Sequence, residues 1–397
     1  MNYPMIVYIL GVILKVQALL MCLPALVAFY YGGSDLAAFL ITIALTGVGG
    51  LACSFRKPKN TVIYAREGFL VTALSWILMS MTGALPFVIA GEIPHYIDAV
   101  FETVSGFTTT GASILTDVES MSRGLLFWRS FTHWIGGMGV LVFVLAILPL
   151  SGGRGLHIMR AESPGPVVGK LVPRVRDTAM ILYGIYIVMT VVLILLLLLG
   201  GMPLYDSAIH AFGTAGTGGF SIWADSIAHY DSAYIDVVLS IGMILFGVNF
   251  NLYYLVLLGK VKTALKSEEL RWYLGIVGAA TLLTAWNILP QIGNVFQSLR
   301  YALFQVSSII TTTGYATADF HLWPEFSRVT LLVLMLLGAC AGSTGGGIKT
   351  SRLVIMLKSA RREIGRMLHP RSVYSIKFEG KSLEDETIRN AVSYTHL

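Results

Sequence analysis

Three short clusters of threonine and glycine recur along this 397-residue chain, and their residue types suit the coordination of a cation. They read SGFTTTGAS at residues 105–113, GTAGTGGFS at 213–221 and SSIITTTGYAT at 307–317. A potassium ion that leaves water must exchange its hydration shell for other oxygens, which a ring of backbone carbonyls can supply. Threonine adds a hydroxyl oxygen and a β-branched side chain that stiffens the backbone. Glycine permits φ values that let consecutive carbonyls point toward one axis.

The clusters share a Thr-Gly pair, which recurs about every hundred residues as expected for an internal repeat. One such cluster alone is better explained as an ordinary loop between helices. Three clusters in one register favour a short filter, which we expect to select potassium less strictly than a longer Gly-Tyr-Gly filter. The predicted filter residues are Thr109, Thr110, Gly111, Thr217, Gly218, Thr312, Thr313 and Gly314.

A further glycine-rich stretch, AGSTGGGIKT at residues 341–350, superficially resembles a phosphate-binding loop. That motif requires Gly, four residues, Gly, Lys and then Ser or Thr. Gly342 and Gly347 have this spacing, but Ile348 follows and Lys349 comes one residue late. The long apolar run before the stretch also replaces the short strand that a phosphate loop needs. Because each glycine costs a helix about 1 kcal/mol relative to alanine, we interpret residues 342–347 as a mobile helix break. A nucleotide-binding enzyme built on this loop is a rival hypothesis.

Composition indicates a membrane protein. Hydrophobic residues make up 55% of the chain, charged residues only 13%, and the mean hydropathy is +0.73, whereas soluble proteins carry about 25% charged residues. The three cysteines lie far apart in sequence and indicate neither a disulfide framework nor a metal site. A net charge of +6 without a basic stripe interleaved with aromatic residues gives no reason to expect nucleic acid as a partner.

Apolar runs of roughly 20 residues, long enough to cross a bilayer, predict eight crossings. They lie near residues 5–30, 36–54, 68–90, 124–150, 178–201, 233–258, 272–290 and 327–357. The first run is too long for the core of a signal peptide, so we expect a retained span. Lysine and arginine concentrate in alternate connectors and acidic residues in the others. The positive-inside rule then places both ends of the chain in the cytoplasm.

The three outer connectors, near residues 91–123, 202–232 and 291–326, each combine a short helix-like stretch, a Thr/Gly cluster and a polar return. Segments too short to span are candidates for re-entrant loops, which must be buried in protein or line a water-filled cavity. The short helix would direct its partially negative C-terminal end toward the ion path.

Further motifs are shared with one known family. They are WRSFTHWIGGMGVLVFVLAILP (128–149), MRAESPGP (159–166), KLVPR (170–174), VNFNLYY (248–254) and CAGSTGGGIKT (340–350). With the three clusters, they make essentially the whole chain resemble the TrkH-type pore subunits of the Trk/Ktr/HKT superfamily of potassium uptake proteins. The two spans before the first repeat also resemble the TrkH branch rather than the shorter KtrB branch.

The resemblance implies an all-α polytopic membrane protein with pseudo-fourfold repeats of span, re-entrant pore loop and span. Three repeats are present, and by spacing the fourth is expected near about residue 410, beyond the end of this sequence. The expected segments are two N-terminal transmembrane helices (1–60), a first pore unit (61–158), a second (159–264), a third with a broken second helix (265–368), and a cytosolic stretch with a truncated end (369–397).

The resemblance also implies a function, namely potassium uptake across the bacterial inner membrane through a carbonyl-lined filter. In the family, an intramembrane glycine-rich loop below the filter acts as the gate. The matching residues here are Gly342, Ser343, Thr344, Gly345, Gly346, Gly347 and Lys349. Lys349 either repels cations in the closed pore or extends toward the cytosol. The alternative is a Na⁺- or H⁺-coupled cation symporter of the same superfamily with weak K⁺/Na⁺ selectivity.

The expected partners are a second copy of the chain, the lipid bilayer and a cytosolic nucleotide-binding regulatory subunit of the TrkA kind, which binds NAD or ATP. We expect no enzymatic activity, no catalytic residue, no cofactor in this chain and no metal beyond the transported K⁺.

Five polar residues in or beside apolar runs have structural rather than chemical interpretations. Arg129 is expected to bond outer carbonyls at a helix end. His133 and His210 are expected to be satisfied by packing rather than by metal. Asn249 and Asn251 are expected to hold helices together inside a span.

Overall fold

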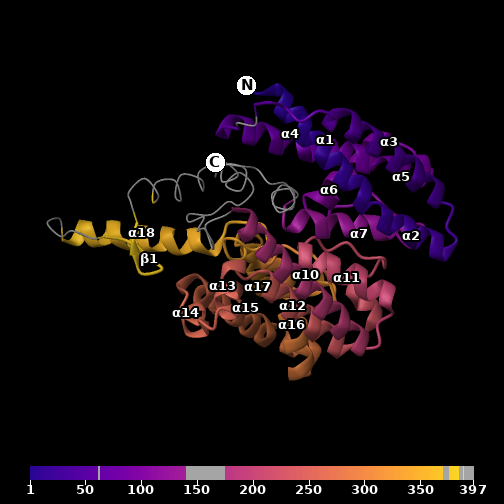
Figure 1. Cartoon of the computed structure of the whole chain (residues 1–397). Helices are drawn as coiled ribbons and strands as arrows, with labels where there is room; N and C mark the ends of the chain where they lie inside the picture. Colours follow the sequence, from indigo (N-terminus) through magenta and orange to yellow (C-terminus); the bar gives the residue numbers. More distant parts are fainter. Residues whose placement is uncertain (61–62, 140–174, 370–374, 384–387, 389–397) are drawn as a thin grey trace. The chain divides into compact units, whose positions relative to one another are not determined.

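The computed structural model describes residues 1–60, 63–139, 175–369, 375–383 and 388, and these residues are mainly helical (Figure 1). They divide into two compact units. The N-terminal unit comprises the described residues up to His229, and the C-terminal unit comprises those from Tyr230 onward.

The N-terminal unit begins with helices whose close approach depends on small residues. Helix α1 packs along α3, and a Cβ placed on Gly50 of α3 would lie 2.8 Å from the carbonyl oxygen of Gly11 in α1. Glycines allow such close crossing of apolar helices. The helices of this unit are α1 (Tyr3–Leu20), α2 (Cys22–Tyr31), α3 (Leu36–Ser54), α4 (Ala65–Gly83), α5 (Leu85–Ile89), α6 (Tyr96–Phe107), α7 (Arg123–Gly137), α10 (Val175–Leu199) and α11 (Leu204–Gly216).

The C-terminal unit is a helical bundle with a small β-hairpin attached. Its elements are α12 (Ala233–Phe246), α13 (Phe250–Leu257), α14 (Val261–Leu265), α15 (Glu268–Ile292), α16 (Val295–Ile310), α17 (Glu325–Leu336), α18 (Thr350–Leu368), β1 (Lys377–Phe378) and β2 (Lys381–Ser382). Tyr273, Ile288 and Val306 are buried where α15, α16 and α17 meet. Helix α18 extends away from this bundle, and the antiparallel β1–β2 hairpin lies against it, with Phe378 packed on Val354 and Ile355 (Figure 1).

Five helical segments among the described residues are long and apolar enough to cross a membrane. They are Tyr3–Tyr31, Leu36–Ser54, Arg66–Ile89, Asp177–Leu199 and Glu268–Ile292, and a bent pair of helices makes a sixth if it counts as one span. These six correspond to six of the eight predicted crossings. The predicted run at 124–150 is described only as far as residue 139, and the run at 327–357 is interrupted between α17 and α18.

The predicted crossing at 233–258 is not one continuous helix. The segment forms two helices, α12 and α13, whose axes differ by 92°. The side chain of Asn249 explains where the second helix begins, because its Oδ1 accepts a hydrogen bond of 2.9 Å from the backbone N–H of Asn251. Asn249 therefore caps α13, and its Oδ1 would also lie 3.1 Å from a Cβ built on Gly342.

Candidate functional site

The three Thr/Gly clusters share one backbone conformation. Each follows the end of a short helix, and its first turn contains a threonine with positive φ, 55° at Thr109, 56° at Thr217 and 58° at Thr312. A β-branched residue pays roughly 1–2 kcal/mol for this left-handed conformation, and such strain concentrates at functional sites. Two residues later each cluster has a glycine with positive φ, 74° at Gly111, 77° at Gly219 and 90° at Gly314.

Hydrogen bonds establish which residues correspond. The backbone N–H of Thr110 donates to the Ser105 carbonyl (2.9 Å), that of Gly218 to the Gly213 carbonyl (2.9 Å) and that of Thr313 to the Ser308 carbonyl (2.8 Å). Gly218 therefore corresponds to Thr110 and Thr313, and the predicted alignment of the second cluster is one residue out of register. Thr217 corresponds to Thr109 and Thr312, and Gly219, which the prediction omitted, corresponds to Gly111 and Gly314.

Glycines pack the first two clusters together in the N-terminal unit. A Cβ on Gly111 would lie 2.0 Å from the Gly218 carbonyl oxygen, so the two clusters touch through their backbones. A Cβ on Gly136 of α7 would lie 2.0 Å from the Phe107 carbonyl oxygen, and one on Gly137 would lie 2.6 Å from Cα of Gly216. Both short helices thus end directly against α7, at distances that any larger residue would prevent.

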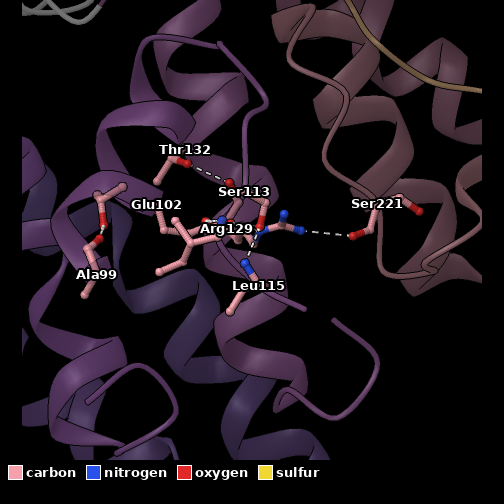
Figure 2. A network of polar contacts seen from close by, with 9 residues as sticks. Ala99, Glu102, Ser113, Leu115, Arg129, Thr132 and Ser221 are labelled. Carbon is pink, nitrogen blue, oxygen red and sulfur yellow. Dashed lines mark hydrogen bonds and ion pairs between the residues drawn. The ribbon is translucent and has the colours of Figure 1, made fainter. Parts of the chain in front are cut away.

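A buried ion pair lies behind the first cluster (Figure 2). Arg129 of α7 donates from Nε to Oε1 of Glu102 in α6 at 2.5 Å, and both side chains are buried. The same carboxylate accepts hydrogen bonds from the Ser113 hydroxyl (2.9 Å) and the Ile114 backbone N–H (3.2 Å). Glu102 therefore connects α6, the short helix before the first cluster, to Ser113 at the end of that cluster and to Ile114 directly after it.

Arg129 extends this connection to the second cluster. Its Nη1 donates to the Ser221 carbonyl oxygen at 3.0 Å, and its guanidinium carbon lies 3.6 Å from the centre of the Phe220 ring. In Figure 2 the guanidinium group lies between Glu102 and Ser221. Arg129 bonds a carbonyl as expected, that of Ser221, but it lies inside α7 rather than at a helix end, and its ion pair with Glu102 was not predicted.

The two histidines near the clusters have different environments. His210 is satisfied, because Nδ1 lies 2.8 Å from the Asp206 carbonyl oxygen and Nε2 lies 3.1 Å from the Ser221 hydroxyl. His133 is fully buried and stacks on Phe220 with ring centroids 4.1 Å apart, and neither ring nitrogen has a hydrogen-bond partner. Within the described ranges, no group of three or more His, Cys, Asp or Glu residues is placed to hold a metal ion.

The third cluster contacts the glycine-rich loop, which we define as residues 342–349, in the C-terminal unit. The Gly346 backbone N–H donates to the Thr312 hydroxyl at 2.7 Å. A Cβ on Gly345 would lie 3.1 Å from the Thr311 carbonyl oxygen. The loop therefore lies directly against the turn of the third cluster, which is equivalent to the turns at Thr109 and Thr217 in the first two clusters.

Backbone hydrogen bonds also join the glycine-rich loop region to the break between α12 and α13. The Cys340 N–H donates to the Gly247 carbonyl, and the Phe250 N–H donates to the Gly342 carbonyl, each at 3.0 Å. Lys349 donates from Nζ to the Gly345 carbonyl within the loop, so its charge is directed at the loop's own backbone. The predicted break is present, and the loop makes specific contacts on several sides.

These observations define a class. Several helices that are long and apolar enough to cross a membrane, together with short helices that each end in a strained Thr/Gly turn, are features of a polytopic helical membrane protein.

Comparison with known proteins specifies the family. Residues 35–393 match the TrkH family, described as a cation transport protein. The chain is 36% identical over 98% of its length to the Trk system potassium uptake protein TrkH of Salmonella typhimurium, covering 82% of that protein. It is 35% identical over 99% of its length to the Trk system potassium uptake protein TrkG of Escherichia coli, covering 82% of that protein.

A solved structure agrees. The crystal structure of the potassium transporter TrkH from Vibrio parahaemolyticus matches with a TM-score of 0.88 and 32% identity, over all of this chain and 83% of that one. The chain therefore belongs to the TrkH family, which confirms the resemblance found in its motifs.

Proposed function

We propose that this chain forms the pore of a potassium uptake system in a bacterial inner membrane. The relatives that it resembles over nearly its whole length are named potassium uptake proteins. The observation that carries the proposal is the backbone conformation common to the three clusters, in which a left-handed threonine precedes a glycine of positive φ by two residues. Carbonyls repeated in this way suit a dehydrated cation.

The ion-coordinating residues of this proposal are 109–111, 217–219 and 312–314. They belong to repeats of span, re-entrant loop and span arranged as a pseudo-fourfold ring. Each short helix ends at its cluster and brings partially negative carbonyls toward the cation. Coupling to Na⁺ or H⁺ is the alternative mechanism, and the names of the relatives do not favour it.

The glycine-rich loop is the gate of this pore in our proposal. Support comes from the hydrogen bond between the loop and Thr312. Because Thr312 belongs to the proposed filter, a movement of the loop would change a contact of the filter directly. We further propose a homodimer with both ends of this chain in the cytoplasm, controlled by a cytosolic nucleotide-binding subunit. The words "Trk system" in the names of the relatives support a multi-component assembly.

Gly314→Ser tests the filter with little steric disturbance. No atom lies within 4 Å of a Cβ at this position, so the substitution acts through the φ of +90° and the carbonyl directions that depend on it. We expect the ratio of Rb⁺ to Na⁺ uptake to fall in a potassium-uptake-deficient host that carries the full-length protein. Gly293→Ser is the matched control, because Gly293 has a φ of +74° and equally open space but lies between α15 and α16. An unchanged Rb⁺/Na⁺ ratio in Gly314→Ser would contradict the proposed filter.

Deletion of residues 343–346 tests the gate. The deletion removes the contact with Thr312 and shortens the loop. We expect basal Rb⁺ flux into vesicles that contain the purified full-length protein to rise. A deletion variant with unchanged basal flux and intact folding would count against a gate at this loop.

A further inference from the structure

Glu269 connects the two ends of the glycine-rich loop. It lies in the first turn of α15 and is only 5% exposed. Its Oε1 accepts hydrogen bonds from the Ala341 backbone N–H at 2.7 Å and from the Ser351 backbone N–H at 3.1 Å. Ala341 directly precedes the loop and Ser351 follows it by two residues, so one oxygen atom closes the base of the loop.

Among the described residues the carboxylate of Glu269 forms no ion pair, although Lys349 of the loop attracts it through a longer-range Coulomb interaction. Burial of a carboxylate is costly unless hydrogen bonds replace its water, and a hydrogen bond to a charged group contributes more than one between neutral groups. The two backbone N–H groups therefore stabilise the buried charge, and the charge in turn holds both N–H groups at one point. Neither Ala341 nor Ser351 needs a special side chain for this contact.

The N-terminus of α15 is itself held by the β1–β2 hairpin. Glu379, at the turn of the hairpin, accepts hydrogen bonds through Oε1 from the Ser267 hydroxyl (2.8 Å) and from the Glu269 backbone N–H (3.0 Å). The hairpin is fixed to α18 by Phe378 and by Lys358, whose Nζ donates to the Lys377 carbonyl at 2.7 Å. Contacts therefore run without a gap from the exposed hairpin through Glu379 and Glu269 to the loop.

We propose that Glu269 is a positioning residue that keeps the glycine-rich loop closed, and that the hairpin at residues 377–382 holds Glu269 in place. The inference rests on the proposed role of the loop as a gate. A partner or modification that displaces the hairpin would loosen the first turn of α15 and, through it, the base of the loop. The hairpin thus offers a cytosolic signal a route to the gate, beside the direct ion pair between Lys358 of α18 and Glu268 of α15.

Glu269→Gln retains the shape of the side chain but removes its charge. We expect basal Rb⁺ flux in vesicles to rise by roughly tenfold, the factor that corresponds to weakening one charged hydrogen bond by about 1.4 kcal/mol. Glu269→Asp retains the charge on a shorter side chain and should give a smaller rise. Glu363→Gln removes an equal charge from the exposed side of α18 and is the matched control, with flux expected to remain unchanged.

A second measurement reports on the loop without relying on conduction. A thiol introduced by Ser343→Cys is labelled with a water-soluble maleimide, and the labelled peptide is quantified by mass spectrometry. We expect labelling at residue 343 to become faster in Glu269→Gln and, to a smaller extent, in Glu379→Gln. Glu379 is exposed, so its substitution tests the same connection without a buried change if Glu269→Gln fails to fold.

The outcomes separate the two proposals. Faster labelling in Glu269→Gln without a change in flux would support the role of Glu269 in holding the loop closed and refute the role of the loop as a gate. A rise in flux on deletion of residues 343–346, with wild-type labelling and flux in Glu269→Gln, would overturn the inference about Glu269. An effect of Glu269→Gln that Glu379→Gln does not share would overturn the role of the hairpin.

Discussion

The buried pair of Glu102 and Arg129 gives a prediction with a definite magnitude. Glu102→Gln removes the negative charge that accepts hydrogen bonds from Arg129, Ser113 and Ile114, and it leaves Arg129, 4% exposed, without a counter-charge. Removal of one partner from a buried pair costs about 3–5 kcal/mol. Since about 1.4 kcal/mol corresponds to tenfold, the unfolding equilibrium should shift roughly a hundredfold or more.

The assay is equilibrium unfolding of the purified protein in mixed detergent micelles, followed by tryptophan fluorescence. The matched control is Glu325→Gln, which removes the same charge from the exposed pair of Glu325 and Arg328 (91% and 45% exposed). An exposed pair contributes about 0–1 kcal/mol. A double variant, Glu102→Gln with Arg129→Met, should recover part of the lost stability because no unpaired charge remains. Equal losses in Glu102→Gln and Glu325→Gln would refute this reasoning.

Two other predictions concern packing and a second ion pair. Gly50→Ala should lower the free energy of unfolding by about 1–3 kcal/mol, since its Cβ would lie 2.8 Å from a backbone oxygen; Gly49→Ala, with 4.0 Å to its nearest neighbour, should raise it by up to about 1 kcal/mol. Asp236→Asn, which loses the 2.6 Å contact with Arg300, should cost several times more than Asp231→Asn, because the Asp236 side chain is 2% exposed and that of Asp231 is 87% exposed. The same unfolding assay measures all four variants. Equal effects of Gly50→Ala and Gly49→Ala would contradict the packing argument, and equal effects of Asp236→Asn and Asp231→Asn would contradict the charge argument.

The sequence predicted most of the long helices and the positions of the three clusters. Hydropathy is sufficient for the helices because a span must be apolar over about 20 residues, and the clusters repeat the same residue types. The register of the second cluster was wrong because Thr217 is followed by two glycines. Only the backbone shows that Gly219, and not Gly218, adopts the positive φ found at Gly111 and Gly314.

Contacts between distant residues could not be predicted. Glu102 and Arg129 are separated by 27 residues, and Glu269 and Ala341 by 72. A hydropathy pattern predicts that a charged residue near the end of an apolar run lies at the membrane surface. No local feature of the sequence indicates that such a residue has a buried partner. The break after α12 was missed because the run at 233–258 is apolar on average and therefore passes as a single span. Asn249, a residue type that caps helices, was the signal available.

The two broken helices of the C-terminal unit satisfy each other's backbone groups. In an apolar setting, a helix break leaves N–H and C=O groups that the protein itself must satisfy. Here Gly247 accepts from Cys340, and Gly342 accepts from Phe250. Residues 246–251 and the glycine-rich loop with its flanks therefore form a matched pair. A chimera between members of the TrkH family that exchanges residues 246–251 without the glycine-rich loop would bring together two segments from different proteins. Their backbone hydrogen bonds would then not match, so the two segments must be exchanged together.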